Sequence, residues 1–247
     1  MKASENVTKI CESLQYLGHG DVSNKILEAL RESTDDPLAV ISLALDSAVT
    51  TAKNKIFKER FSKSKLGDPI YIKDLLNYKV RQLDLEYIQN LASLGFIRDR
   101  RNVVIYGPPG TGKTWLSKAL ATRACQEGYK ARWVTYPFLC RELMRLKKKD
   151  TTKYESRLKY YCKYSVLCID EFPNCSIEDK YIMQEFFNYF KTNGHSCIVC
   201  SQCNPDNWDT LFEIKSFAQS IKGRLLEHSY RLELKGPDLR FYVPDKE

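Results

Sequence analysis

The chain has 247 residues, of which 43% are hydrophobic, which is enough for one full α/β domain and a small additional domain. Lysine and arginine number 39 against 31 aspartates and glutamates, so the net charge of +8 favours a polyanionic partner. No apolar run approaches the roughly 18 residues that a membrane-spanning helix needs, and the first 20 residues contain no signal-peptide core. We therefore expect a cytoplasmic protein that does not enter a membrane.

A small all-α domain is predicted for residues 1–66. Apolar stripes from Val7 to Leu17 and from Ile26 to Leu30 are separated by Gly18-His19-Gly20, which predicts two short helices. The turn Leu66-Gly67-Asp68-Pro69 predicts the boundary with a second domain, residues 67–247. Before that turn, a third helix is expected to begin near Leu38 and to bury Ile41, Leu45, Val49, Ala52 and Ile56.

The distal half of this third helix is strongly basic. It holds six cations within thirteen residues, with Glu59 as the lone acid and with Phe57 and Phe61 interleaved. Such a run is either a solvated helix end or a strip that binds the phosphates of a nucleic acid, and the density of charge favours the second. The candidate nucleic-acid-binding residues are Lys53, Lys55, Lys58, Arg60, Lys63 and Lys65.

Residues Val103–Thr114, VVIYGPPGTGKT, fit the spacing G-x-x-x-x-G-K-[ST] of a nucleotide-binding P-loop. An apolar strand precedes the loop and an apolar helical pattern follows it, which is the order that the motif requires. Glycines in such a loop let backbone N–H groups turn toward a phosphate, the lysine reaches the β and γ phosphates, and the threonine hydroxyl binds Mg²⁺. The predicted ATP-binding residues are Gly107, Pro108, Pro109, Gly110, Thr111, Gly112, Lys113, Thr114 and Trp115.

The next strand is expected at residues 131–135, and Pro137 marks the start of the helix after it. Residues 141–163 then hold nine basic residues against three acidic ones, including Lys147-Lys148-Lys149. A solvated surface and a DNA-facing strip are equally good interpretations of this stretch.

Residues Ser165–Glu171, SVLCIDE, form an apolar run that ends in two carboxylates, as a buried parallel strand does at the C-terminal edge of its sheet. The run follows the P-loop by about fifty residues, with a strand and a helix between them. We therefore expect Asp170 to hold Mg²⁺ and Glu171 to orient or activate the water that attacks the γ phosphate. The second acid favours hydrolysis over phosphoryl transfer to a substrate hydroxyl.

A further buried strand, Ser196–Ser201, ends at Gln202, whose amide is expected near the γ phosphate. The same strand contains part of Cys197-x-x-Cys200-x-x-Cys203, which has the spacing of a metal site. Strand alternation turns Cys197 and Cys200 in opposite directions, so reduced structural thiols are a better interpretation of the nine cysteines than zinc or iron–sulfur ligands.

Taken together, these blocks resemble the AAA+ ATPases that serve as transposition helpers for insertion sequences (IstB-like), near relatives of the DnaC-type helicase loaders. The resemblance covers nearly the whole chain. It rests on the helical N-terminus with its basic end and on NVVIYGPPGTGKTWLSKALATRACQEG, SVLCIDEF, CSQCNPDNW and GRLLEHSYRLELKG. It implies an α/β fold: a P-loop AAA+ ATPase domain with a central parallel sheet, preceded by a small all-α N-terminal domain.

The resemblance also implies roles for single residues. Gln202 stands where many relatives have an asparagine that senses the γ phosphate. Arg224 is similar in position to the arginine that relatives insert into a neighbour's ATP site, although Gly223 stands where an aspartate is common. Arg240, in the closing GPDLR, resembles a further arginine of the family. The implied catalytic residues are Glu171, Lys113, Arg224 and Gln202, and the implied Mg²⁺ ligands are Thr114 and Asp170.

The function implied by the resemblance is ATP hydrolysis stimulated by DNA and by oligomerisation. With ATP, a homo-oligomer would assemble on double-stranded target DNA and recruit or activate the transposase encoded by the same element. Two alternatives stay open: a loader of a replicative helicase, and a DNA-binding adaptor that uses ATP for assembly without significant hydrolysis. The intact Lys113, Asp170 and Glu171 argue against the adaptor.

Overall fold

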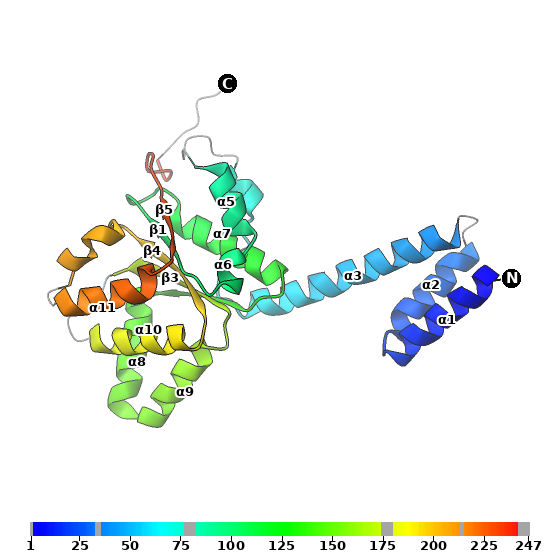
Figure 1. The fold of residues 1–247 in the computed structure, drawn as a ribbon, viewed down its shortest axis with the longest axis horizontal. Helices are drawn as coiled ribbons and strands as arrows, with labels where there is room; N and C mark the ends of the chain where they lie inside the picture. The colour runs from blue at the N-terminus through cyan, green and yellow to red at the C-terminus, as the bar shows by residue number, and fades with distance from the viewer. Residues whose placement is uncertain (1, 33–35, 77–82, 174–179, 213–214, 242–247) are drawn as a thin grey trace, which may run out of the picture. The chain divides into compact units, whose positions relative to one another are not determined.

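The computed structural model describes residues 2–32, 36–76, 83–173, 180–212 and 215–241, which form two compact units, residues 1–56 and 57–247 (Figure 1). The division falls inside helix α3 (Pro37–Ser62), whereas the turn after Leu66 predicted it later in the chain. The difference arises because Phe57, Phe61 and Leu66 pack in the hydrophobic core of the second unit.

The first unit contains α1 (Lys2–Tyr16), α2 (Gly20–Glu32) and most of α3, so the three expected helices are present. Its small core is formed by Cys11, Ile26 and Ile41. The expectation that α3 also buries the later residues of its apolar stripe is wrong, because α1 and α2, with 15 and 13 residues, are too short to cover a helix of 26. The side chains left exposed are Leu45, Val49, Ala52 and Ile56.

The second unit is built on a five-stranded parallel sheet in the order β2-β3-β4-β1-β5. This confirms the expected central parallel sheet. The strands are β1 (Val103–Tyr106), β2 (Ala131–Thr135), β3 (Val166–Phe172), β4 (Ser196–Ser201) and β5 (Tyr230–Glu233).

Helices cover both faces of this sheet (Figure 1). On one face lie α5 (Leu85–Ala92), α6 (Gly95–Arg98) and α7 (Lys113–Gln126), with the short α4 (Ile72–Leu76) against α7. On the other face lie α8 (Tyr136–Lys149), α9 (Thr151–Tyr161), α10 (Lys180–Thr192), the 3-10 helix η3 (Pro205–Thr210) and α11 (Lys215–Leu226).

Strand residues alternate between these two faces. In β1, Val103 and Ile105 pack with the α7 side while Val104 packs with the α8–α11 side. In β4, Cys197 packs with the α8–α11 side and Cys200 with the α7 side, which confirms that their side chains point in opposite directions. Burial raises the pKa of the Cys200 thiol, so it stays protonated. Cys175 lies outside the described residues.

Because all five strands are parallel, their C-terminal ends meet at one edge of the sheet, where open α/β sheets bind ligands. The P-loop follows β1, the Asp170-Glu171 pair lies at the end of β3, and Gln202 follows β4. The Gly107 N–H donates to the Ser201 carbonyl at 3.2 Å, which joins the P-loop to the end of β4. Within the described ranges, no helix is both long enough and apolar enough to cross a membrane.

Candidate functional site

The P-loop glycines adopt backbone conformations that disfavour a Cβ atom. Gly107, Gly110 and Gly112 have φ angles of 144°, 76° and 91°. A Cβ on Gly107 would lie 2.2 Å from the Leu234 carbonyl oxygen, and one on Gly110 would lie 1.9 Å from Oδ1 of Asp238. The need for glycine here therefore comes from the neighbouring C-terminal segment as well as from the loop itself.

Lys113 lies folded back on its own loop. Its Nζ donates to the carbonyl oxygens of Gly107 at 2.8 Å and Pro108 at 2.6 Å, and the residue is 9% exposed. Burial lowers the pKa of Lys113, and the nearby Arg240 charge acts in the same direction. A phosphate would give this ammonium a charged acceptor in place of two neutral carbonyls, and such hydrogen bonds are stronger.

Thr114 and Asp170 are in direct contact. The Thr114 hydroxyl donates to Oδ2 of Asp170 at 2.7 Å, and the other carboxylate oxygen accepts the Glu171 backbone N–H at 2.9 Å. Asp170 is 8% exposed, while Glu171 is exposed and has a φ of 59°. A hydroxyl and a carboxylate are hard oxygen donors of the kind that Mg²⁺ prefers, so these two residues fit that ion.

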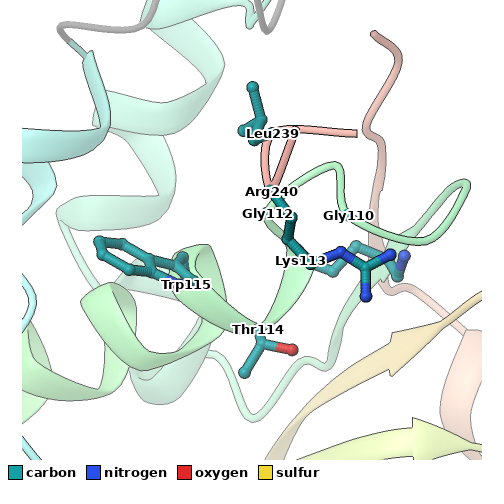
Figure 2. Close-up of a pocket in the computed structure, with 7 residues that line it drawn as sticks. All are labelled: Gly110, Gly112, Lys113, Thr114, Trp115, Leu239 and Arg240. Carbon is teal, nitrogen blue, oxygen red and sulfur yellow. The ribbon is translucent and has the colours of Figure 1, made fainter. Parts of the chain in front are cut away.

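A cavity of about 490 Å³ opens above the N-terminal end of α7, within the size range of small-molecule sites. Figure 2 shows the charged ends of Lys113 and Arg240 on the same side of this cavity. Two cations and the positive end of a helix make it suitable for a polyphosphate. Its lining residues are Gly110, Gly112, Lys113, Thr114, Trp115, Leu239 and Arg240.

The C-terminal strap, residues 234–241, forms one side of this cavity. The Leu234 N–H donates to the Tyr106 carbonyl at 2.7 Å, and the Leu239 N–H donates to the Gly110 carbonyl at 3.1 Å. Arg240 Nε donates to both oxygens of Asp238, at 2.9 and 3.1 Å, which lowers the pKa of Asp238 to about 2. Within this segment the sequence analysis singled out only Arg240, because nothing local indicates that the chain returns to the P-loop.

Trp115 connects the cavity to a second hollow of about 460 Å³. Its side chain is 52% exposed, and the two cavities share Thr114 and Trp115. The turn predicted as a domain boundary, residues 66–69, lines this second hollow. The other lining residues are Ile70, Asp74 and Lys118.

Gln202 and Arg224 are not among the residues that line either cavity. Gln202 is exposed just beyond β4, at the same sheet edge as the P-loop. Arg224 lies on α11, where its guanidinium contacts the Asn188 side chain and donates to the Ser220 carbonyl at 2.6 Å. The structure therefore brings Lys113, Thr114 and the Asp170-Glu171 pair together, and it leaves Arg224 outside the cavity of its own chain.

A parallel sheet in this order, with a P-loop after β1 and an acid pair at the end of β3, defines a P-loop ATPase domain of the AAA+ class. Solved structures share the fold. DnaI aligns with a TM-score of 0.54 at 20% identity, over 67% of this chain and 91% of that chain. DnaA bound to AMPPCP and single-stranded DNA aligns with a TM-score of 0.54 at 17% identity, over 70% of this chain and 52% of that chain.

The chain belongs to the family described as IstB-like ATP binding protein, which it matches over residues 28–243. An insertion sequence ATP-binding protein of Sinorhizobium fredii is 26% identical over 92% of both chains. The ATP-binding protein of insertion sequence IS232 from Bacillus thuringiensis subsp. berliner is 32% identical. This match covers 64% of this chain and 63% of the IS232 protein, which is less than two thirds of either. The family expected from the sequence blocks is confirmed.

Proposed function

We propose that this protein hydrolyses ATP in order to control its assembly on target DNA, where it recruits or activates a transposase of an insertion sequence. The observation that carries the proposal is the contact between Thr114 and Asp170 at 2.7 Å beside the Lys113 cavity, with Glu171 next in the chain. This contact between the nucleotide-binding loop and the first acid of the pair supports hydrolysis of a bound nucleotide, which needs both groups at the phosphates.

Each residue has a role in this proposal. Lys113 and the P-loop N–H groups bind the phosphates, and Arg240 adds a second cation on the strap side of the cavity. Thr114 and Asp170 hold Mg²⁺, which when bound neutralises charge on the phosphates. Glu171 orients the attacking water and accepts its proton. Gln202, exposed just beyond β4, would turn toward the γ phosphate when the nucleotide is bound.

The partners are inferred from charge and from the relatives. A net charge of +8 suits a polyanion such as double-stranded DNA. The two relatives above are named as ATP-binding proteins of insertion sequences, which supports a transposase of the same element as client. The proposed working form is a cytoplasmic homo-oligomer, in which a neighbouring copy supplies the Arg224 that lies outside the cavity of its own chain. A helicase loader would share the ATP site but would respond to a replicative helicase.

The test is phosphate release from ATP, measured with and without duplex DNA and with and without the transposase. Wild-type protein should be stimulated by DNA and again by the transposase. Lys113→Ala should abolish ATP binding and release, because it removes the ammonium from the phosphate cavity. Arg123→Ala, on the same helix but in an exposed pair with Glu127, is the matched control and should retain activity.

Two results would contradict parts of this proposal. ATP-dependent assembly without DNA-stimulated phosphate release would favour the adaptor. Stimulation by a replicative helicase and not by the transposase would favour the loader.

A further inference from the structure

A third cavity, of about 290 Å³, lies at the opposite edge of the sheet, where β2 and β3 begin. We call it the α3–α9 pocket, because its walls come from the end of α3, the end of α9 and the residue before β2. It belongs wholly to the second unit. Its lining residues are Glu59, Arg60, Lys63, Lys130, Tyr160, Lys163 and Tyr164.

Hydrogen bonds fix the end of α3 against the edge strand β2. The Trp133 N–H donates to the Ser64 carbonyl at 2.8 Å, and Arg132 Nη1 donates to the Lys63 carbonyl at 3.0 Å. On the other side, the Val166 N–H donates to the Lys130 carbonyl at 3.2 Å, which ties the residue before β2 to the start of β3. Hydrogen bonds therefore hold two of the three walls, the end of α3 and the residue before β2, against the start of the sheet.

The pocket carries an excess of positive charge. Its lone carboxylate, Glu59, is engaged by Lys63 at 3.0 Å and by Arg60 at 3.8 Å. Lys130 and Lys163 have no ion pair within the part of the chain that the structure describes. The Nε atom of Arg60 is buried without a hydrogen-bond partner, as is that of Arg132 beside the pocket. The pocket favours an anion because four cations, Arg60, Lys63, Lys130 and Lys163, line it against one carboxylate that is already paired.

Two tyrosines add neutral donors to the same wall. The hydroxyls of Tyr160 and Tyr164 are 2.8 Å apart, and the Arg132 guanidinium lies 5.9 Å from both ring centroids. Burial raises the pKa of Tyr164 to about 12, so its phenol keeps its proton at neutral pH. Because one hydroxyl donates to the other, one O–H of the pair is free to donate to a ligand oxygen.

We propose that the α3–α9 pocket binds backbone phosphate of duplex DNA. This inference rests on the proposed function and names the place where the DNA is held. Lys58 and Lys65, both exposed, continue the positive charge beyond the pocket. Duplex DNA presents one negative charge per ~1.7 Å of axis, so it reaches the pocket and these flanking lysines together, which a single free phosphate does not. The structure thereby brings Arg60 and Lys63 of α3 together with Lys130 and Lys163, which are far from them in sequence.

The test is the binding of a fluorescent DNA duplex, followed by anisotropy with ATP and Mg²⁺ at several NaCl concentrations. Lys130→Gln combined with Lys163→Gln should weaken binding about ten-fold and lower the slope of log affinity against log salt by roughly 1–2. Lys9→Gln combined with Lys25→Gln removes the same charge from exposed sites in the first unit and is the control. It should change the affinity and the salt slope less than the Lys130 and Lys163 variant does. Lys130→Arg with Lys163→Arg should retain wild-type binding.

The outcomes separate this inference from the proposed function. If wild-type protein fails to bind duplex DNA under these conditions, both are overturned. If wild-type protein binds but the Lys130 and Lys163 variant keeps the same affinity and slope, the pocket inference alone is overturned, and an acidic protein segment becomes the better ligand. An equal loss in the control pair would show that net charge matters and not the pocket, which also overturns the inference.

Discussion

At the scale of single residues, the glycines of the P-loop face different neighbours. A Cβ at Gly107 would meet the Leu234 backbone, which is hydrogen-bonded to the end of β1 and cannot move alone. A Cβ at Gly110 would meet the carboxylate of Asp238, the end of a side chain on the strap. Substitution at Gly107 should therefore disturb the sheet, whereas substitution at Gly110 should displace the strap.

We predict that Gly110→Ala leaves the domain folded but weakens nucleotide binding. The left-handed φ of 76° costs an alanine about 1–2 kcal/mol, and the displaced Asp238 carries Arg240 away from the cavity. Thermal unfolding and the binding of a fluorescent ATP analogue would measure the two effects separately.

Asp238→Ala provides the matching background for this test. Adding Gly110→Ala to Asp238→Ala should cost less affinity than adding it to wild type, because the clash with the carboxylate is already gone. Equal costs in both backgrounds would show that the strap contact has no part in the effect.

These residues also show what the sequence can and cannot predict. Lys113, Thr114 and Asp170 were predicted because each belongs to a recognisable local pattern at the end of a strand, and parallel strands end at one edge. Asp238 was missed because its contact with Gly110 spans more than a hundred residues and carries no local signal. The cavity beside the turn at 66–69 was likewise not predicted, because a turn that ends a domain and a turn that lines a cavity have the same composition.

At the scale of elements, burial patterns decided which predictions succeeded. The bounds of β2 and β4 match those predicted. For β4 the reason is that a strand buried at every position is a continuous apolar run between turns. For β2, which lies at the edge of the sheet and is buried only at Ala131 and Val134, the bound after the strand was given by Pro137 at the start of the next helix. The apolar stripe of α3 was misleading, because periodicity shows which face is apolar but not whether a partner helix is long enough to cover it.

The turn between α10 and β4 provides a pH-dependent prediction. His195 packs on Phe190 with ring centroids 5.1 Å apart, and burial lowers the pKa of His195, with the Arg100 charge acting in the same direction. The unfolded chain therefore binds a proton on His195 more readily than the folded chain does. The contribution of His195 to stability is complete above a pH of about 6.5, and it is lost as the pH falls toward the lowered pKa of the folded state.

We predict that His195→Gln makes the unfolding free energy less sensitive to pH between about 7 and 5.5, because the group that binds a proton on unfolding is removed. Urea unfolding at a series of pH values measures this slope. His19→Gln removes an exposed histidine from the first unit and serves as the control. A wild-type slope in His195→Gln would exclude any linkage at this turn.

At the scale of the whole molecule, the cavity of one chain has no unpaired arginine among the described residues that line it. Transferring a phosphoryl group develops negative charge that an arginine commonly stabilises. Within one chain, Arg240 lines the cavity with its charge paired to Asp238, and Arg224 is held by Asn188 and Ser220 away from it. A second copy that supplied Arg224 would complete the site, and ATP would then favour the assembled state over the free chain.

We therefore predict that Arg224→Ala binds ATP nearly as well as wild type but loses hydrolysis by roughly 10³-fold or more. Lys222→Ala, on the same helix and paired with Asp209, should retain activity and is the control. Glu171→Gln alone should also be inactive, because its own site lacks the acid.

Mixing the two inactive variants decides whether the arginine acts between chains. An Arg224→Ala subunit keeps its acid, and a neighbouring Glu171→Gln subunit keeps its arginine, so some interfaces in a mixed oligomer carry both groups. With equal amounts and random assembly, about one quarter of the sites are complete, and phosphate release should recover to about that fraction of wild type. Recovery requires exchange of subunits, which a labelled mixture can verify. If subunits exchange and activity stays absent, Arg224 does not act on a neighbour's site.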